Sequence, residues 1–240
     1  MTDERIHEDS VGTILFDGAL APQVDGQWFL ADYWRARGGL RMQPGGRGGV
    51  AFIDTPAGEA ALRHYRRGGL VAKLFGDRYL WTGRDRSRSV REFRLLAELQ
   101  RRGLPVSPPL ASRYVRHGLR YTADLITLKI PAATTLAECL ASGDFDAALA
   151  SRVGELVARF HRQGAWHADL NAHNILVNEA GLYLIDFDRG RLRTPAEGWR
   201  RANLARLHRS LLKLGAGKLA SFEDKLWPVL VDHYEQAYAA

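Results

Sequence analysis

Short apolar runs separated by turn residues fill much of the first half of the chain, and they predict β-strands. One pair of strands is expected at Val50–Ile53 and Ala60–Tyr65, joined by a turn through residues 56–58. A second pair is expected at Arg113–Val115 and Leu119–Leu128. The first half of the chain is therefore predicted to be built around a sheet.

Helical periodicity takes over elsewhere. Apolar residues at three- and four-residue steps predict a helix over Ser89–Gln100, which ends before Gly103. In the second half, a short helix is expected over Thr135–Ala141 and a longer one over Asp146–Gln163. Two more helices are predicted after residue 188. Their apolar stripes are Leu204, Leu207, Leu211 and Leu214 for the first, and Phe222, Leu226, Leu230 and Tyr234 for the second.

The pattern breaks at Lys129–Pro131, which we interpret as a hinge. The prediction is a bilobal α+β fold, with a lobe of sheet and one helix at residues 1–128 and a helical lobe at residues 129–240. A chain of this length can bury a sizeable core without disulfides, and its single cysteine, Cys139, cannot form an internal one. That favours a reducing, cytoplasmic compartment. The sequence shows no secretion signal and no long apolar run, so no membrane span is expected.

Positive charge is concentrated in one segment of the chain. The formal net charge is +7, yet residues 63–102 hold twelve Lys and Arg against four Asp and Glu. Such segregation indicates an anionic partner, which would be phosphorylated lipid, a membrane surface or nucleic acid. The alternative is a solvated basic face that has no partner.

The strongest chemical signal is a spaced pair of motifs in the second half. His167–Asn174, with the sequence HADLNAHN, sets the carboxylate of Asp169 and the amide of Asn174 five residues apart. A hairpin predicted over residues 175–185 then carries Asp186 back to the same edge. A phosphotransferase needs this convergence of oxygen-bearing side chains: a base for the acceptor hydroxyl, and two groups that hold Mg²⁺ against the ATP phosphates.

Two other interpretations of these residues stay open. An Asp and an Asn at this spacing are common in turns and helix caps, although the hairpin context argues against coincidence. Alternatively, His167, Asp169 and His173 would ligate zinc or iron. That reading leaves Asn174 and Asp186 without a role.

A glycine-rich loop at Pro44–Gly49 lies upstream of the motifs. Gly46 and Gly48 would let backbone N–H groups approach phosphate oxygens closely, because no Cβ intervenes. The motif is weak by itself. It gains weight because it precedes Glu92, in the first turns of the predicted helix, and then the Asp169 motif, which is the order that protein kinases use.

Beyond this general order, several segments resemble the bacterial 3-deoxy-D-manno-octulosonic acid (Kdo) kinases, which belong to the kinase-like lipopolysaccharide core kinase family. The segments are Leu62–Gly69, Asp77–Tyr79, Glu92–Phe93, Gly103–Val106 and Ile185–Arg189. The resemblance implies a protein-kinase-like fold. It also implies ATP-dependent phosphorylation of the 4-hydroxyl of Kdo on a Kdo–lipid A precursor, in lipopolysaccharide inner-core biosynthesis.

Carried over to this sequence, the resemblance implies that Asp169 is the catalytic base and that Asn174 and Asp186 bind Mg²⁺. His167 would hold the loop in place without taking part in the chemistry. Asp188 stands where kinases usually have glycine. Aspartate tolerates turn conformations, so it would replace that glycine sterically, with a supporting metal contact as the alternative.

The residue that grips the ATP phosphates is ambiguous. Arg63 occupies the expected strand and would face Glu92, whereas Lys73 looks more like the familiar kinase lysine but follows a turn. We favour Arg63 at the phosphates and Lys73 near the acceptor. Arginine is always charged and can clamp phosphate with a fork, but it is not equivalent to lysine.

The expected partners are a lipid-linked Kdo acceptor and an anionic surface, with the protein peripheral on the cytoplasmic side of the bacterial inner membrane. No nucleic acid and no obligate protein partner are expected. One rival function is another small-molecule phosphotransferase, such as an antibiotic kinase, although the basic segment suits cationic drugs poorly. Another is a non-catalytic, kinase-shaped module that binds RNA or anionic lipid, suggested by the missing lysine and the altered glycine.

Overall fold

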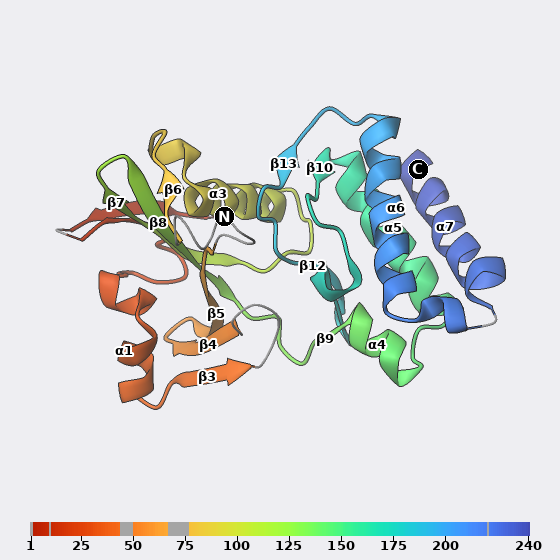
Figure 1. The fold of residues 1–240 in the computed structure, drawn as a ribbon, viewed down its shortest axis with the longest axis horizontal. Helices are drawn as coiled ribbons and strands as arrows, with labels where there is room; N and C mark the ends of the chain where they lie inside the picture. The colour runs from red at the N-terminus through yellow and green to blue at the C-terminus, as the bar shows by residue number, and fades with distance from the viewer. Residues whose placement is uncertain (1, 10, 44–49, 67–76, 220) are drawn as a thin grey trace. The chain divides into compact units, whose positions relative to one another are not determined.

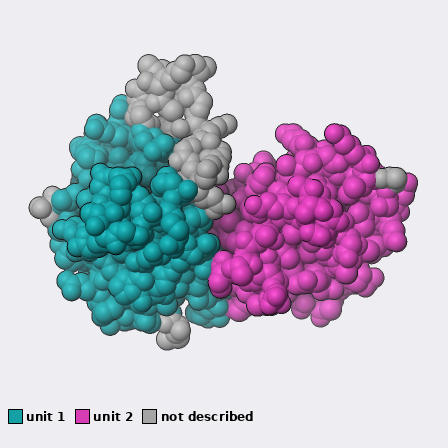
Figure 2. All heavy atoms as spheres, turned by 90° about the horizontal axis from the view of Figure 1, so that it is seen from below, with its two compact units in different colours: residues 1–101, 107–129 teal, residues 102–106, 130–240 magenta. Residues whose placement is uncertain are grey.

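The computed structural model describes residues 2–9, 11–43, 50–66, 77–219 and 221–240. The chain divides into two compact units (Figure 2). Unit 1 comprises residues 1–101 and 107–129, and unit 2 comprises residues 102–106 and 130–240.

Unit 1 is built on one antiparallel sheet, in which the described part of the chain contributes eight strands. The path of neighbouring strands is β1-β2-β7-β8-β5-β4-β3, and β6 pairs with β8. The strands are β1 (Glu4–Glu8), β2 (Thr13–Asp17), β3 (Leu40–Gln43), β4 (Val50–Thr55), β5 (Gly58–His64), β6 (Tyr79–Leu80), β7 (Pro109–His117) and β8 (Arg120–Leu128). The two predicted strand pairs are confirmed as β4–β5 and β7–β8.

Side chains along a strand alternate between the two faces of a sheet, so successive residues of the β5 segment contact different helices. Ala60 and Leu62 of β5 belong to a buried cluster that includes aromatic residues of η1 (Gly26–Phe29) and α1 (Ala31–Ala36). Arg63 and Tyr65 contact Glu92 of α3 (Arg88–Arg101), which follows the short η2 (Arg84–Arg86) and packs on β7 and β8. The predicted helix over Ser89–Gln100 is thus confirmed.

Unit 2 is mainly helical (Figure 1). Its helices are α4 (Leu136–Ser142), α5 (Ala147–Arg162), α6 (Glu197–Lys213) and α7 (Trp227–Ala239), with shorter turns η3 (Ala172–Asn174), η4 (Ala216–Lys218) and the π-helical η5 (Phe222–Leu226). Two small sheets complete it: β12 (Gly181–Leu184), β11 (Ile175–Asn178) and β9 (Thr134–Thr135) form one, and β10 (Ala165–Trp166) and β13 (Arg191–Leu192) the other.

The helix starts follow from local chemistry. Thr135 caps α4 in a reciprocal capping box with Glu138, and the Asp146 side chain accepts from the backbone N–H of Leu149 at the start of α5. Helices α5 and α7 pack closely along each other (Figure 1). Gly154 makes this possible, since a Cβ there would lie 2.1 Å from the carbonyl oxygen of Leu230.

The predicted apolar stripes are mostly buried. Leu204, Leu207 and Leu211 of α6 are buried, but Leu214 is 39% exposed, so including it was wrong. It follows the last residue of α6, where the helical repeat no longer applies. All four residues of the second stripe are buried, across η5 and α7.

Residues 102–106 belong to unit 2 because they pair with its strands. Val106 forms a parallel bridge with Leu184 of β12, and the Leu184 N–H donates to the carbonyl of Pro105 at 3.0 Å. The α+β class, a sheet with helices in one unit and a helical second unit, is confirmed. None of the described helices is long and apolar enough to cross a membrane.

Candidate active site

The predicted hairpin is present and brings two of the candidate residues to one end. Strands β11 and β12 are antiparallel with Ile175 opposite Leu184, and the turn closes where Gly181 donates to the side chain of Asn178 at 3.0 Å. At the open end, the N–H of Ile185 donates to the carbonyl of Asn174 at 3.0 Å. Asn174 and Asp186 therefore lie beside one another along the backbone, as the spacing predicted.

His167 fixes the loop from inside. Its ring is buried, Nε2 lies 3.0 Å from the carbonyl oxygen of Ile185, and Nδ1 accepts from the backbone N–H of Asp169 at 3.1 Å. Burial lowers the pKa of His167, so the ring is neutral, with its proton on Nε2. Both ring nitrogens are occupied. The alternative zinc or iron set of His167, Asp169 and His173 is therefore wrong.

Two amides hold the backbone of Asp169. Its carbonyl accepts from Nδ2 of Asn174 at 2.9 Å and from Nδ2 of Asn171 at 3.0 Å. Asn171 also caps the short η3, because its Oδ1 accepts from the His173 N–H at 2.9 Å. Since Asn174 donates through its nitrogen, its Oδ1 oxygen is the atom it can offer to a cation.

Asp186 has an unusual backbone. Its φ is 61°, in the left-handed region that aspartate and asparagine adopt more readily than other non-glycine residues. The turn lets Phe187 enter the core, where its ring stacks on Phe160 at 5.7 Å and meets the His167 ring edge-on at 4.6 Å. Asp188 is not among the positive-φ residues, so the turn does not need a glycine there.

These residues suit Mg²⁺ better than a transition metal. Among the described residues, no three His, Cys, Asp or Glu side chains gather to hold a metal ion. Magnesium at phosphate-binding sites needs only one or two protein oxygens, because phosphates and water complete its shell. Asn174 and Asp186 supply one amide oxygen and one carboxylate at the same hairpin end, so the donor set fits.

Helix α6 carries a polar face toward the loop that the sequence analysis missed. Asn203, Arg206 and Ser210 are spaced three and four residues apart, so they lie on one side of the helix. Asn203 bonds the backbone N–H and C=O of His167 at 3.3 and 2.9 Å. Ser210 Oγ accepts from the Ala172 N–H at 3.1 Å, and Arg206 Nη1 donates to Oδ1 of Asp169 at 2.8 Å.

A buried chain of hydrogen bonds supports Asn203 from behind. Oδ1 of Asn203 lies 3.3 Å from Nε2 of His161, whose Nδ1 lies 2.9 Å from the hydroxyl of Tyr234. Burial lowers the pKa of His161 to about 4 and raises that of Tyr234 to about 12. Both groups are therefore neutral at pH 7. The Tyr234 hydroxyl can then donate to His161, which in turn donates to Asn203.

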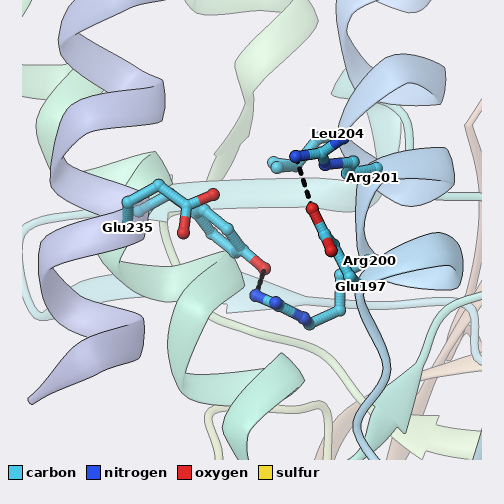
Figure 3. A pocket seen from close by; sticks show the side chains of 6 residues that line it. Glu197, Arg200, Arg201, Leu204 and Glu235 are labelled. Carbon is cyan, nitrogen blue, oxygen red and sulfur yellow. Dashed lines mark hydrogen bonds and ion pairs between the residues drawn. The ribbon is translucent and has the colours of Figure 1, made fainter.

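A small polar hollow of about 210 Å³ opens where this chain of hydrogen bonds ends (Figure 3). Arg200 donates to the Tyr234 hydroxyl at 3.0 Å, and Arg201 pairs with Glu197 one turn away. None of Asp169, Asn174 and Asp186 lines it. The hollow is therefore not the place where those three groups gather.

In unit 1, Arg63 faces Glu92 as predicted. The Glu92 side chain is 2% exposed and accepts from the Arg63 guanidinium and from the Tyr65 hydroxyl. Such a buried carboxylate needs its partners, because an uncompensated buried charge is costly. Gly46, Gly48 and Lys73, which were predicted to contact the nucleotide, lie outside the described residues.

If Arg63 grips the ATP phosphates, replacing it with methionine is expected to abolish most of the thermal stabilisation that ATP gives. It should also lower the free energy of unfolding without nucleotide by roughly 1–3 kcal/mol, because Glu92 loses its charged partner. Arg63→Lys keeps the charge and should retain part of both effects. Melting curves with and without ATP separate the loss of stabilisation by ATP from the loss of stability of the protein itself.

Arg101→Met is the matched control for this measurement, because Arg101 also pairs with a glutamate of α3, Glu98, but its side chain is 61% exposed. It should change neither quantity appreciably. If Arg63→Met keeps its full response to ATP while Lys73→Met loses it, the two assignments are reversed.

The basic segment is partly balanced by acids from far away in the sequence. Arg84 pairs with Glu8 at 3.1 Å, and Arg94 pairs with Glu4 at 2.8 Å and with Asp85 at 2.7 Å. Two of these acids lie on β1, outside the segment in which the charges were counted. The charge that this surface offers to a partner is therefore smaller than the sequence count.

Comparison with known proteins finds relatives that match most of the chain. The 3-deoxy-D-manno-octulosonic acid kinase of Xylella fastidiosa (strain M23) is 50% identical over 207 residues, covering 85% of this chain and 81% of that protein. The enzyme of the same name from Xanthomonas campestris pv. campestris (strain B100) is 47% identical over 237 residues, covering 95% and 91%. A solved structure described as WaaP in complex with acyl carrier protein is 18% identical, with a TM-score of 0.49 over 86% of this chain and 91% of that one.

The match extends to a family as a whole. The sequence model of the lipopolysaccharide kinase (Kdo/WaaP) family covers residues 31–234. That range includes the Arg63–Glu92 pair of unit 1 and the loop at residues 167–174 of unit 2. The kinase-like fold and the phosphotransferase class expected from the sequence are confirmed, and the chain belongs to the lipopolysaccharide kinase (Kdo/WaaP) family.

Proposed function

We propose that this protein transfers the γ-phosphoryl group of ATP to the 4-hydroxyl of Kdo on a Kdo–lipid A precursor, a step of lipopolysaccharide inner-core biosynthesis. One observation carries the proposal. The hairpin and loop of unit 2 gather Asp169, Asn174 and Asp186, in a chain whose relatives are named for the phosphorylation of this sugar acid. A non-catalytic binding module would have no need of all three groups.

In the proposed reaction, Asp169 accepts the proton of the acceptor hydroxyl. The hydroxyl oxygen forms a bond to the γ-phosphorus, the bond from that phosphorus to the β–γ bridging oxygen breaks, and its electron pair leaves with ADP. Asn174 and Asp186 would hold Mg²⁺, which neutralises charge on the phosphates when bound. The amides of Asn171 and Asn174 keep the Asp169 backbone in place for this role.

In unit 1, Arg63 is proposed to grip the ATP phosphates. Glu92 and Tyr65 contact the guanidinium, and the Arg63 side chain is 32% exposed. Gly46 and Gly48 are proposed to bring backbone N–H groups to the same phosphates, and Lys73 to lie near the acceptor.

The proposal is tested by transfer of labelled phosphate from ATP, with Mg²⁺, to three separate acceptors. These are a Kdo–lipid A precursor, RNA and an aminoglycoside, and Asp169→Asn protein serves as the blank. Transfer to the first alone supports the proposal. Transfer to the aminoglycoside would support the rival antibiotic phosphotransferase, and binding of RNA or lipid without any transfer would support the non-catalytic module.

The protein is also proposed to attach to the anionic cytoplasmic face of the inner membrane through its basic segment. Each Lys or Arg near such a surface contributes about 1 kcal/mol. Arg86 and Arg91 are exposed, whereas Arg84 is paired with Glu8 and Arg88 lies over the ring of Tyr79.

Sedimentation with anionic vesicles is expected to fall steeply as salt rises, since the Debye length shrinks from about 10 Å at 0.1 M to about 3 Å at 1 M. Arg86→Gln/Arg91→Gln protein should bind vesicles more weakly and still phosphorylate a delipidated acceptor. The matched control is Arg35→Gln/Arg201→Gln, two exposed arginines of α1 and α6. Binding that ignores both salt and the first pair of substitutions contradicts peripheral attachment through this segment.

A further inference from the structure

Arg206 contacts Asp169, the base of the proposed reaction. Its Nη1 lies 2.8 Å from Oδ1 of Asp169, and the two side chains are 47% and 59% exposed. An exposed ion pair of this kind contributes only about 0–1 kcal/mol to folding. A contribution to folding stability therefore explains little of the presence of an arginine at position 206.

The position of Arg206 on α6 is well fixed. Asn203, one turn before it, bonds both backbone groups of His167, and Ser210, one turn after it, accepts from the Ala172 N–H. The same helix face thus holds the loop on both sides of Asp169. The guanidinium lies next to the carboxylate because these bonds hold the helix and the loop together on both sides of the pair.

The Arg206 guanidinium can form further hydrogen bonds. Among the described residues it donates to Asp169, and that bond uses one of its five N–H groups. Any acceptor whose hydroxyl reaches the Asp169 carboxylate must lie beside this guanidinium, because both bind the same carboxylate. A planar guanidinium can hold two carboxylates at once along different edges.

We propose that Arg206 binds the carboxylate of the sugar-acid acceptor and so places its hydroxyl against Asp169. The inference rests on the proposed function, since it is the sugar acid that brings a carboxylate to the site. It assigns selection for an acidic sugar to one residue of α6. A neutral sugar would leave the guanidinium with solvent and Asp169 only, and would gain no charge-assisted bond.

The test compares two acceptors in steady-state kinetics: the Kdo-bearing acceptor with its free carboxylate, and the same acceptor as its carboxyl methyl ester. Wild-type protein should use the acid with a kcat/KM roughly 10- to 100-fold higher, the worth of a charge-assisted pair. Arg206→Gln should lose that preference by raising KM for the acid, with the KM for ATP unchanged. Arg206→Lys should restore part of it.

Arg201→Gln is the matched control, because Arg201 lies on the same helix in an exposed ion pair with Glu197. It should keep the wild-type preference, and melting temperatures confirm that each variant is folded. An equal loss of kcat with both acceptors in Arg206→Gln would overturn the proposal, since it would show that Arg206 only positions Asp169. A raised KM for ATP would overturn it in favour of a phosphate contact. If wild-type protein phosphorylates neither acceptor, it is the proposed function that fails, and this inference fails with it.

Discussion

Asp169→Asn is expected to lower kcat by roughly 10²–10⁴-fold, the usual worth of a positioned general base. The substitution keeps the shape of the side chain and removes its negative charge, and with it the ability to accept a proton. The fold should persist, because the contacts that fix residue 169 are made by its backbone: the N–H to His167 Nδ1, and the carbonyl to Asn171 and Asn174. The side chain itself is 59% exposed and meets Arg206.

The measurement is a phosphoryl-transfer assay at saturating ATP and acceptor, accompanied by a melting curve. Asp232→Asn is the control, as an exposed aspartate on α7 of the same unit. It should leave kcat unchanged. A kcat for Asp169→Asn within a few-fold of the wild-type value would remove Asp169 from the chemistry, and the loop would then be only a turn.

Much of this site was predictable because its signals are local. The hairpin that carries Asp186 back to Asn174 needs only two short apolar runs and a turn, and Asn178 closes that turn with its own side chain. Helix α3 follows from the spacing of Val90, Phe93 and Leu96. The Arg63–Glu92 contact joins distant residues, and it was expected because the resemblance to kinases implies a cation on this strand that faces Glu92.

The N-terminal part of the chain was not predicted, for a physical reason. Strand β1 has the sequence ERIHE and is exposed throughout, so it lacks the buried alternation that marks a strand. It exists because it pairs with β2, which in turn pairs with β7 about a hundred residues later in the sequence. The apolar run at residues 14–16 was the available signal, and all five residues of β2, TILFD, are buried.

The polar face of α6 was missed for a different reason. Asn203, Arg206 and Ser210 directly precede the leucines of the apolar stripe, so they look like the flank of an ordinary amphipathic helix. Nothing in the local sequence says which polar residues meet solvent and which meet another segment. Only the tertiary contacts with His167, Asp169 and Ala172 distinguish them.

Asp186→Asn is expected to weaken the binding of Mg²⁺–ATP by roughly 10–100-fold, the scale seen when the surroundings of a bound metal are altered. Magnesium prefers charged oxygen ligands, and the variant replaces a carboxylate with a neutral amide. Asparagine also tolerates the left-handed backbone that residue 186 adopts, at φ 61°. The turn that buries Phe187 should therefore survive, and the melting temperature without nucleotide should change little.

Phe187→Leu supplies the opposite comparison, because Phe187 is buried against Phe160 and His167 and carries no metal-binding oxygen. It should lower the melting temperature while the folded protein still binds Mg²⁺–ATP. Titrations of ATP with Mg²⁺ and with a chelator separate the metal from the nucleotide: the chelator should abolish tight binding in wild-type protein and change little in Asp186→Asn. If Asp186→Asn instead destabilises the fold and leaves Mg²⁺–ATP affinity intact, the Asp186 carboxylate has a structural role, and the metal must be held by other oxygens.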